Sequence, residues 1–169
     1  MKVNSVLDIS FSSESSTYPC TLDEVSDFIK VDLTDDDTLI TELIKTATTL
    51  CEGFLGISLR TRTVTAYLDN SAGNTELPYG PVTAFTSLTD ADGNVIASTD
   101  YTLRGGGFKY LEEPEYAYLV AVYTTGYATL PVQFKTGVMQ QVAHLYENRG
   151  DVGLSDKAKQ TLAPYRRVV

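Results

Sequence analysis

The chain has 169 residues, of which 43% are hydrophobic and 21% are charged, which is enough for one domain with a modest core. Its formal net charge of -9, from 13 basic and 22 acidic side chains, argues against tight, sequence-independent nucleic-acid binding over the whole surface, because such binding needs a basic footprint. Two cysteines are too few for a disulfide framework, and the sequence has neither the roughly 20-residue apolar run of a membrane span nor a signal peptide, so we expect an intracellular protein at synthesis.

The first 20 residues are expected to form a flexible arm, because residues 10–17 (SFSSESST) are rich in serine. Thr21 and Glu24 then have the spacing of a capping box, which predicts a short helix to about residue 30.

The strongest helical pattern runs from about residue 35 to residue 55, after a second cap at Thr34. Its apolar positions recur every three or four residues: Leu39, Ile40, Leu43, Ile44, Ala47, Leu50, Cys51, Phe54 and Leu55. A stripe this wide predicts packing against more than one element, and Gly53 or Gly56 is expected to end the helix.

Between residues 60 and 123 the pattern changes, because Thr, Val and Tyr become common and turn signals recur. Strands are expected near 62–69, 82–89, 94–97, 100–104, 107–110 and 117–123. Asp92-Gly93 indicates a hairpin turn, Pro78–Pro81 a rigid turn, and Gly105–Gly107 a flexible loop or the tip of a hairpin. The segment is therefore predicted to be an antiparallel β insertion between helices.

A further helix is predicted over about 131–149, and one of its faces is unusual because it is polar and almost uncharged. Six residues on that side are candidates for a contact between subunits: Gln133, Gly137, Gln140, Gln141, His144 and Asn148. A solvated helix face normally carries Lys and Glu, and a glycine permits close backbone approach. Ordinary exposure to solvent is the alternative explanation of the same pattern.

The C-terminal segment carries the chain's main basic cluster. Ser155 is expected to cap a short helix that Pro164 ends, and residues 131–169 hold 6 basic and 3 acidic side chains, a balance of +3, against -12 for residues 1–130. As a docking segment it would use Lys157, Lys159, Leu162, Tyr165, Arg166 and Arg167. Arg and Tyr are enriched where interfaces carry binding energy, although a solvated basic tail would look the same.

The residues that could carry chemistry do not form a recognised site. His144 is the only histidine, and no nucleophile motif accompanies it. The acidic run from Asp32 lacks the glycine and glutamate of a calcium loop, and Arg104–Gly107 lacks the Lys-Ser/Thr of a phosphate loop. Cys20 and Cys51 with one histidine cannot assemble a zinc site. We therefore predict no catalytic, cofactor-binding or metal-binding residue, and no enzyme.

These patterns together predict an α+β fold, with a small antiparallel helical bundle, an inserted antiparallel β region, and a C-terminal helix plus tail. The expected organisation is a flexible arm over 1–20, a single helical domain over 21–154 with its β insertion at about 60–123, and a docking segment over 155–169.

Five short phrases in a fixed order carry a family resemblance. They are LDEVSDFIKVDLTDDDTLITELI (22–44), LPYGPV (77–82), VYTTGYATLP (122–131), AHLYENRG (143–150) and LAPYRR (162–167). In this combination the chain resembles the head–tail connector (adaptor) proteins of long-tailed double-stranded DNA phages. The likeness covers roughly residues 20–169, whereas the first 20 residues and Gly105–Gly107 have no counterpart in the pattern.

The resemblance implies a structural virion protein of the neck, assembled after synthesis in the host cytoplasm. Such proteins form a ring of about twelve subunits through head-to-tail contacts. The ring lies beneath the portal protein, extends the channel through which DNA passes without sequence-specific binding, and offers a platform to a stopper or tail-completion protein. Portal docking then maps onto Ser155–Val169. Another neck component, such as a stopper or tail-completion protein, is the alternative; no cofactor and no membrane partner is implied.

Overall fold

The computed structural model describes residues 5–13, 15–32, 34–71, 73–112 and 116–167. The chain forms two compact units, one from residues 1–15 and 60–127 and the other from residues 16–59 and 128–169. The first unit contains the β-strands and the second contains the helices. The fold is therefore mixed α and β with antiparallel sheets, as predicted, and each unit has its own core.

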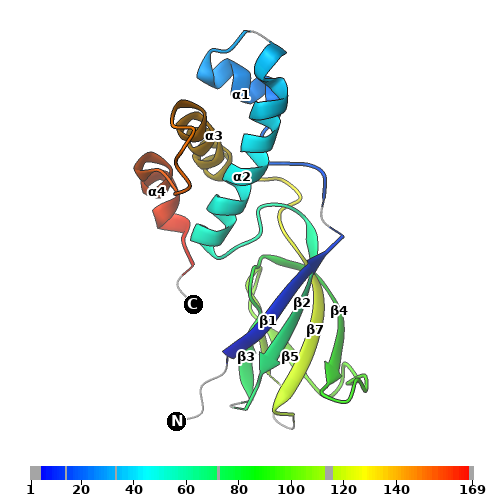
Figure 1. The fold of residues 1–169 in the computed structure, drawn as a ribbon. Coiled ribbons are helices and arrows are strands. Elements are labelled where there is room, and N and C mark those ends of the chain that lie inside the picture. The colour runs from blue at the N-terminus through cyan, green and yellow to red at the C-terminus, as the bar shows by residue number, and fades with distance from the viewer. Residues whose placement is uncertain (1–4, 14, 33, 72, 113–115, 168–169) are drawn as a thin grey trace. The chain divides into compact units, whose positions relative to one another are not determined.

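The β unit consists of two antiparallel sheets. The larger has the order β1-β2-β7-β4 and the smaller the order β3-β6-β5, and Figure 1 shows the four strands of the larger sheet lying side by side. The strands of the larger sheet are β1 (Ser5–Ser12), β2 (Arg62–Asp69), β7 (Tyr118–Thr125) and β4 (Val82–Asp90). Those of the smaller sheet are β3 (Asn74–Glu76), β6 (Tyr110–Glu112) and β5 (Thr102–Arg104).

The core of the β unit follows from the alternation of side chains along its strands. Every second residue of β2 and β7 is buried, so one face of the large sheet is apolar. The buried cluster consists of Val64, Ala66, Leu68, Leu77, Val82, Leu88, Ile96, Leu111, Leu119, Ala121 and Tyr123. The hydroxyl of Tyr123 donates to the carbonyl oxygen of Pro78 at 2.8 Å, so the largest buried ring also has its polar group satisfied.

Strand β1 corrects the prediction of a flexible arm for residues 5–12, whereas residues 1–4 and 14 lie outside the described residues. Ser5–Ser12 pairs antiparallel with β2 as an edge strand of the large sheet, and Val6 and Ile9 pack against the core. The alternation is interrupted by a bulge between Val6 and Asp8. A bulge shifts the period-two pattern of side chains by one residue, and serines occupy outward-facing positions of the strand. The sequence therefore lacks the regular alternation that predicts a strand.

The remaining strands agree with the prediction in part. β2, β4 and β7 lie within a few residues of the expected ranges, whereas β3 was missed because only three residues pair. Residues 94–97 contribute only an isolated bridge between Val95 and Thr89. The hairpin expected at 100–110 is shifted to 102–112.

The helical unit contains four α-helices and two short 3-10 turns within the described residues. They are α1 (Leu22–Ile29), η1 (Thr34–Asp36), α2 (Asp37–Leu55), α3 (Val132–Glu147), α4 (Asp156–Leu162) and η2 (Ala163–Tyr165). The predicted capping box is confirmed: the Glu24 amide donates to the Thr21 hydroxyl at 3.3 Å, and the Thr21 amide donates to the Glu24 carboxylate at 3.0 Å. The second cap is corrected, because Asp36 precedes α2 without a side-chain cap.

The core of the helical unit lies where α2, α3 and α4 meet. α2 ends at Gly56, whose φ of 68° lies in the left-handed region that favours glycine. On these three helices the buried apolar residues are Ile40, Ile44, Ala47, Cys51, Leu55, Phe134, Val138, Val142, Leu145, Ala158 and Leu162. Polar links join the helices as well, since Lys135 pairs with Glu24 and the Tyr146 hydroxyl donates to Asp36 at 2.5 Å.

Within the described part of the chain, none of the helices combines the length and hydropathy that a bilayer-spanning helix requires.

Candidate assembly interfaces

The C-terminal segment divides into a buried anchor and an exposed basic surface. The Ser155 hydroxyl accepts the amide of Ala158 at 3.2 Å, which begins α4 as the sequence predicted. Lys157 and Lys159 are exposed on the other side of this helix. α4 therefore presents ammonium groups to solvent while its apolar residues are buried in the unit.

Leu162 belongs to the anchor and not to the surface. Its side chain has no exposed area, and it packs directly on Gly137 of α3. A Cβ atom at position 137 would lie 2.6 Å from both Cγ and Cδ2 of Leu162, closer than carbon atoms approach. Of the residues predicted for docking, Leu162 is thus unavailable to a partner in this structure, and Gly137 has a packing role within the chain.

The tail that follows α4 folds back on the helical unit. The ring of Tyr165 meets that of Phe134 edge-on at 5.4 Å, and the guanidinium of Arg166 lies 5.1 Å from the centre of the Phe54 ring. The amide of Arg167 donates to the carbonyl oxygen of Leu55 at 2.9 Å. Tyr165 and Arg166 nevertheless remain exposed, so their polar groups can meet a partner.

Gln141 holds the connection between α3 and α4. Its side chain is fully buried, its amide nitrogen donates to the carbonyl oxygen of Gly153 at 2.8 Å, and its amide oxygen accepts the N–H of Ser155 at 2.8 Å. A buried amide with both groups satisfied fixes the path of a loop. Gln141, predicted as an interface candidate, is therefore enclosed by its own chain.

The other four candidates of the α3 face reach the surface. Gln133 and Asn148 are exposed, while Gln140 and His144 are half-buried. Gln140 accepts the Thr161 hydroxyl at 2.8 Å, and His144 Nε2 lies 2.7 Å from Asp151 Oδ2. Their role in a subunit contact stays a prediction.

The loop after α3 is also stabilised by Asp151. Its carboxylate accepts the amide of Gly153 at 3.0 Å in addition to the contact with His144. The amide of Gly153 and, next, the His144 ring lower the pKa of the Asp151 carboxyl below its usual value.

A groove of about 350 Å³ lies beside these residues, within the helical unit. It is lined by Phe28, Gln140, Ala143, His144, Glu147, Ser155, Asp156 and Lys157, so α1, α3 and the start of α4 all contribute. Phe28 is an aromatic residue with 46% of its surface exposed, and it brings α1 into the lining of the groove.

The thiols of the helical unit are poor nucleophiles. Burial raises the pKa of the Cys20 and Cys51 thiols to about 12. Among the described residues, His, Cys, Asp and Glu do not gather into groups of three or more that could hold a metal ion. The distinctive features of this unit are its packing and its charged surface.

A comparison with family models decides the family. The model described as "Head completion protein" matches residues 20–160. The chain belongs to the head completion protein family. The resemblance to head–tail connectors that the sequence carried is thereby confirmed at the family level. Among curated proteins, no match to this chain was found.

Solved structures share the fold. A chain of the "Neck of empty GTA particle computed with C6 symmetry" is similar with a TM-score of 0.75 and 20% identity, covering 96% of this chain and 97% of that one. Chains of the "Virion of native gene transfer agent (GTA) particle" and of the "Neck of native GTA particle computed with C12 symmetry" each have a TM-score of 0.71, with 21% and 20% identity, covering 95% of this chain and 96% of those. At this identity the likeness establishes the fold.

Proposed function

We propose that this head completion protein is a structural subunit of the neck of a phage-like particle, and that within the neck it is the adaptor below the portal. The observation that carries the proposal is the agreement of two comparisons: the family match spans residues 20–160, and the fold likeness to neck chains spans nearly the whole chain. In this role about twelve copies form a ring. The ring extends the DNA channel and offers the stopper or tail a platform.

Ring symmetry supports the subunit role. The similar neck structures were computed with C6 and C12 symmetry. A closed ring of identical chains needs a heterologous contact, in which each subunit offers two different surfaces. The exposed Gln133 and Asn148 and the half-buried Gln140 and His144 are proposed for one of these surfaces.

The C-terminal segment is proposed to dock on the portal. Lys157, Lys159, Tyr165 and Arg166 are exposed together with the half-buried Arg167, and they give an otherwise acidic chain one basic end. Because α4 and the tail are already anchored by apolar packing, docking can use this surface without unfolding the unit. The acidic balance of the rest of the chain fits a surface that DNA passes without being held.

The test is native mass spectrometry of the chain mixed with the portal ring from the same genome. We expect a mass increase of about one chain per portal subunit, as the closed ring requires. The double substitution Arg166→Glu with Arg167→Glu should abolish the complex. Lys30→Glu with Lys45→Glu changes the net charge equally on other elements of the helical unit and should leave it intact. Portal binding by the Arg166/Arg167 variant at the wild-type level would contradict the docking role.

A stopper or tail-completion protein remains the alternative within the neck, because the family description does not separate these components. The partner distinguishes them. Binding to an assembled adaptor ring or to a tail tube, with none to an intact portal, would assign the chain to that later position.

A further inference from the structure

The outer face of the large sheet has an unusual composition. The register places its residues in rows across the four strands: Asp8, Tyr67, Val120 and Thr89 in one row, Ser10, Thr65, Val122 and Ser87 in the next, and Ser12, Thr63, Thr124 and Ala84 in the third. Asp69 and Tyr118 pair beyond the first row. Hydroxyl, β-branched and tyrosine side chains therefore cover this outer face.

Charge is scarce on the outer face and has one sign. Solvated protein surfaces typically carry about 25–35% charged residues with both signs mixed. Here the charged residues are Asp8 and Asp69, at one end of the sheet, and none of the residues named above is basic. Depletion of charge with enrichment of tyrosine is the compositional mark of an interface centre.

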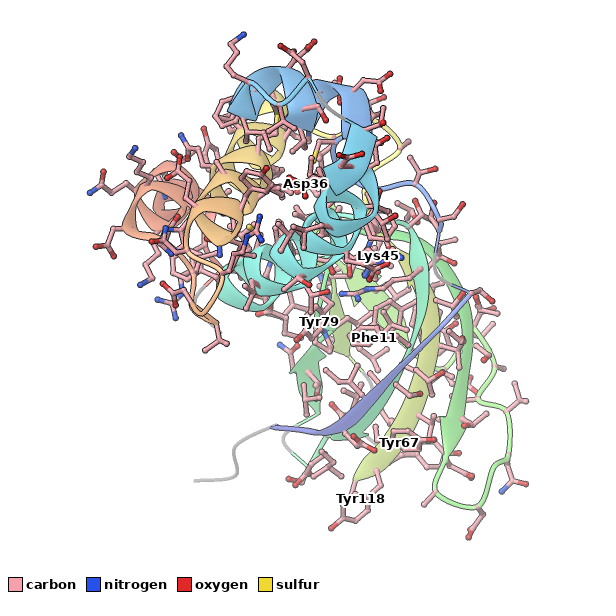
Figure 2. All side chains as sticks on the ribbon, turned by 45° about the horizontal axis from the view of Figure 1, so that its top comes forward. Phe11, Asp36, Lys45, Tyr67, Tyr79 and Tyr118 are labelled. Carbon is pink, nitrogen blue, oxygen red and sulfur yellow. The ribbon has the colours of Figure 1, made fainter. Side chains whose placement is uncertain are left out.

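Two tyrosines are presented on this face. Tyr67 is 41% exposed and Tyr118 is 55% exposed, and Figure 2 shows both at the same end of the sheet. Val120 and Val122, on the strand between β2 and β4, are half-buried by their neighbours, and they are apolar where an outward-facing strand usually carries polar residues. The opposite face of the sheet is filled by the core of the β unit.

The size of the outer face suits a protein partner. Four strands spaced about 4.8 Å apart, each about 8 residues long at about 3.4 Å per residue, give roughly 400–500 Å². A standard interface buries about 800 Å² on each partner. The outer face therefore supplies more than half of such an interface, and the residues around its rim can supply the rest.

We propose that the outer face of the sheet β1-β2-β7-β4 binds the exposed α3 surface of the neighbouring copy in the ring. The inference rests on the proposed function, because it supplies the second surface that ring closure needs. DNA does not fit this face, since its only charges are carboxylates. Gln133, Gln140 and Asn148 are uncharged polar residues, as are most residues of the sheet face. Glu147 on the same helix is exposed and acidic, whereas the exposed Arg149 that follows the helix complements Asp8 and Asp69.

The test places a charge in the middle of the outer face. Thr65→Lys, and separately Ser10→Lys on the edge strand, should bind the portal in fewer copies than the full ring, because a lysine at the centre of an uncharged interface is left desolvated and unpaired. Thr49→Lys, the same change at an exposed position of α2, should assemble as the wild type does. Thermal unfolding by circular dichroism identifies any variant that does not fold, and the folded variant of the two then decides.

Full rings of a folded Thr65→Lys or Ser10→Lys variant would overturn the sheet face as an interface. A charge exchange tests the α3 side: Arg149→Asp should lower ring occupancy, and Asp8→Arg in the same chain should restore it. Restoration is expected only if the two positions meet across copies, and its absence would overturn α3 as the opposing surface. Failure of the wild-type chain to bind the portal or itself would instead count against the proposed function.

Discussion

The contact between Gly137 and Leu162 yields a sharp prediction about stability. Leu162 is fully buried, and its Cγ and Cδ2 atoms lie 2.6 Å from where a Cβ atom of residue 137 would be. Since Cγ is the branch point of the leucine side chain, rotation about the last side-chain bond cannot relieve the clash. Gly137→Ala must therefore either force the fully buried Leu162 out of its rotamer or shift α4 relative to α3, and Leu162→Ala must leave a cavity at the same place.

The magnitudes follow from general experience with buried substitutions. Leu162→Ala should lower the free energy of unfolding by about 2–5 kcal/mol. Gly137→Ala should cost about 1–3 kcal/mol for overpacking, offset by about 1 kcal/mol of helix propensity. In the double variant the alanine methyl at position 137 enters the space that Leu162 vacated. The overpacking cost disappears, and the double variant should be about 1–3 kcal/mol more stable than the sum of the single effects predicts.

Denaturant unfolding followed by far-ultraviolet circular dichroism measures this cycle, because the helical unit dominates the signal. Gln160→Ala, an exposed position on α4, is the control and should change stability by less than about 0.5 kcal/mol. If the two single effects add in the double variant within about 0.3–0.5 kcal/mol, the contact does not couple the two helices and the packing argument fails.

Three further predictions concern the helical unit. Gln141→Ala should lower the free energy of unfolding by about 2–4 kcal/mol, since it removes two buried hydrogen bonds of the α3–α4 loop, and an unchanged denaturation midpoint would be inconsistent with that role. The hydrogen bond from Lys135 holds the pKa of the Glu24 carboxyl below its usual value. The stability that results is fully present above the unfolded pKa of about 4.3 and is lost as the pH falls through the lowered folded value. Glu24→Gln retains the capping box and should reduce the loss of stability at acid pH, measured as the free energy of unfolding against pH. Because burial raises the pKa of Cys20 and Cys51 to about 12, both thiols should react with a thiol reagent only as fast as the unit opens, and rapid labelling of the native chain would contradict their burial.

The helices and the long strands could be predicted because each carries its own local signal. α2 has a wide stripe of apolar residues and a C-terminal glycine, and α1 has the Thr21–Glu24 capping box. Along β2 and β7, buried residues alternate with half-buried or exposed residues. In each case the short-range pattern and the final environment agree.

The elements that were missed owe their structure to distant residues. β1 is a strand because β2 offers it a partner more than fifty positions along the chain, whereas its own serines and bulge indicate no strand. Three-residue β3 is stabilised by pairing with β6. Neither condition can be read from a local window, because strand pairing depends on which segments the fold brings together.

The same limit explains why two of the six residues predicted on the α3 face are enclosed by their own chain, while the role of the other four stays a prediction. Gly137 and Gln141 look like their neighbours in sequence, yet one is covered by Leu162 and the other is hydrogen-bonded to the loop before α4. A polar, uncharged helix face is compatible with two roles. Its amides can be buried and hold a loop by hydrogen bonds, or they can form a neutral surface that contacts another copy. Only the packing of α4 separates them.

The packing of α4 also divides the C-terminal segment into a buried part and an exposed part. Leu162 and Ala158 contribute the apolar burial that holds α4 on α3, so their truncation acts on folding before it acts on any partner. The exposed lysines and Arg166 contribute little to that packing, and exposed charges typically change stability by less than about 1 kcal/mol. Charge reversal at the surface and truncation of the anchor should therefore give opposite profiles, the first losing partner binding at unchanged stability and the second losing stability first. The proposed docking surface can therefore be altered without unfolding the unit that carries it.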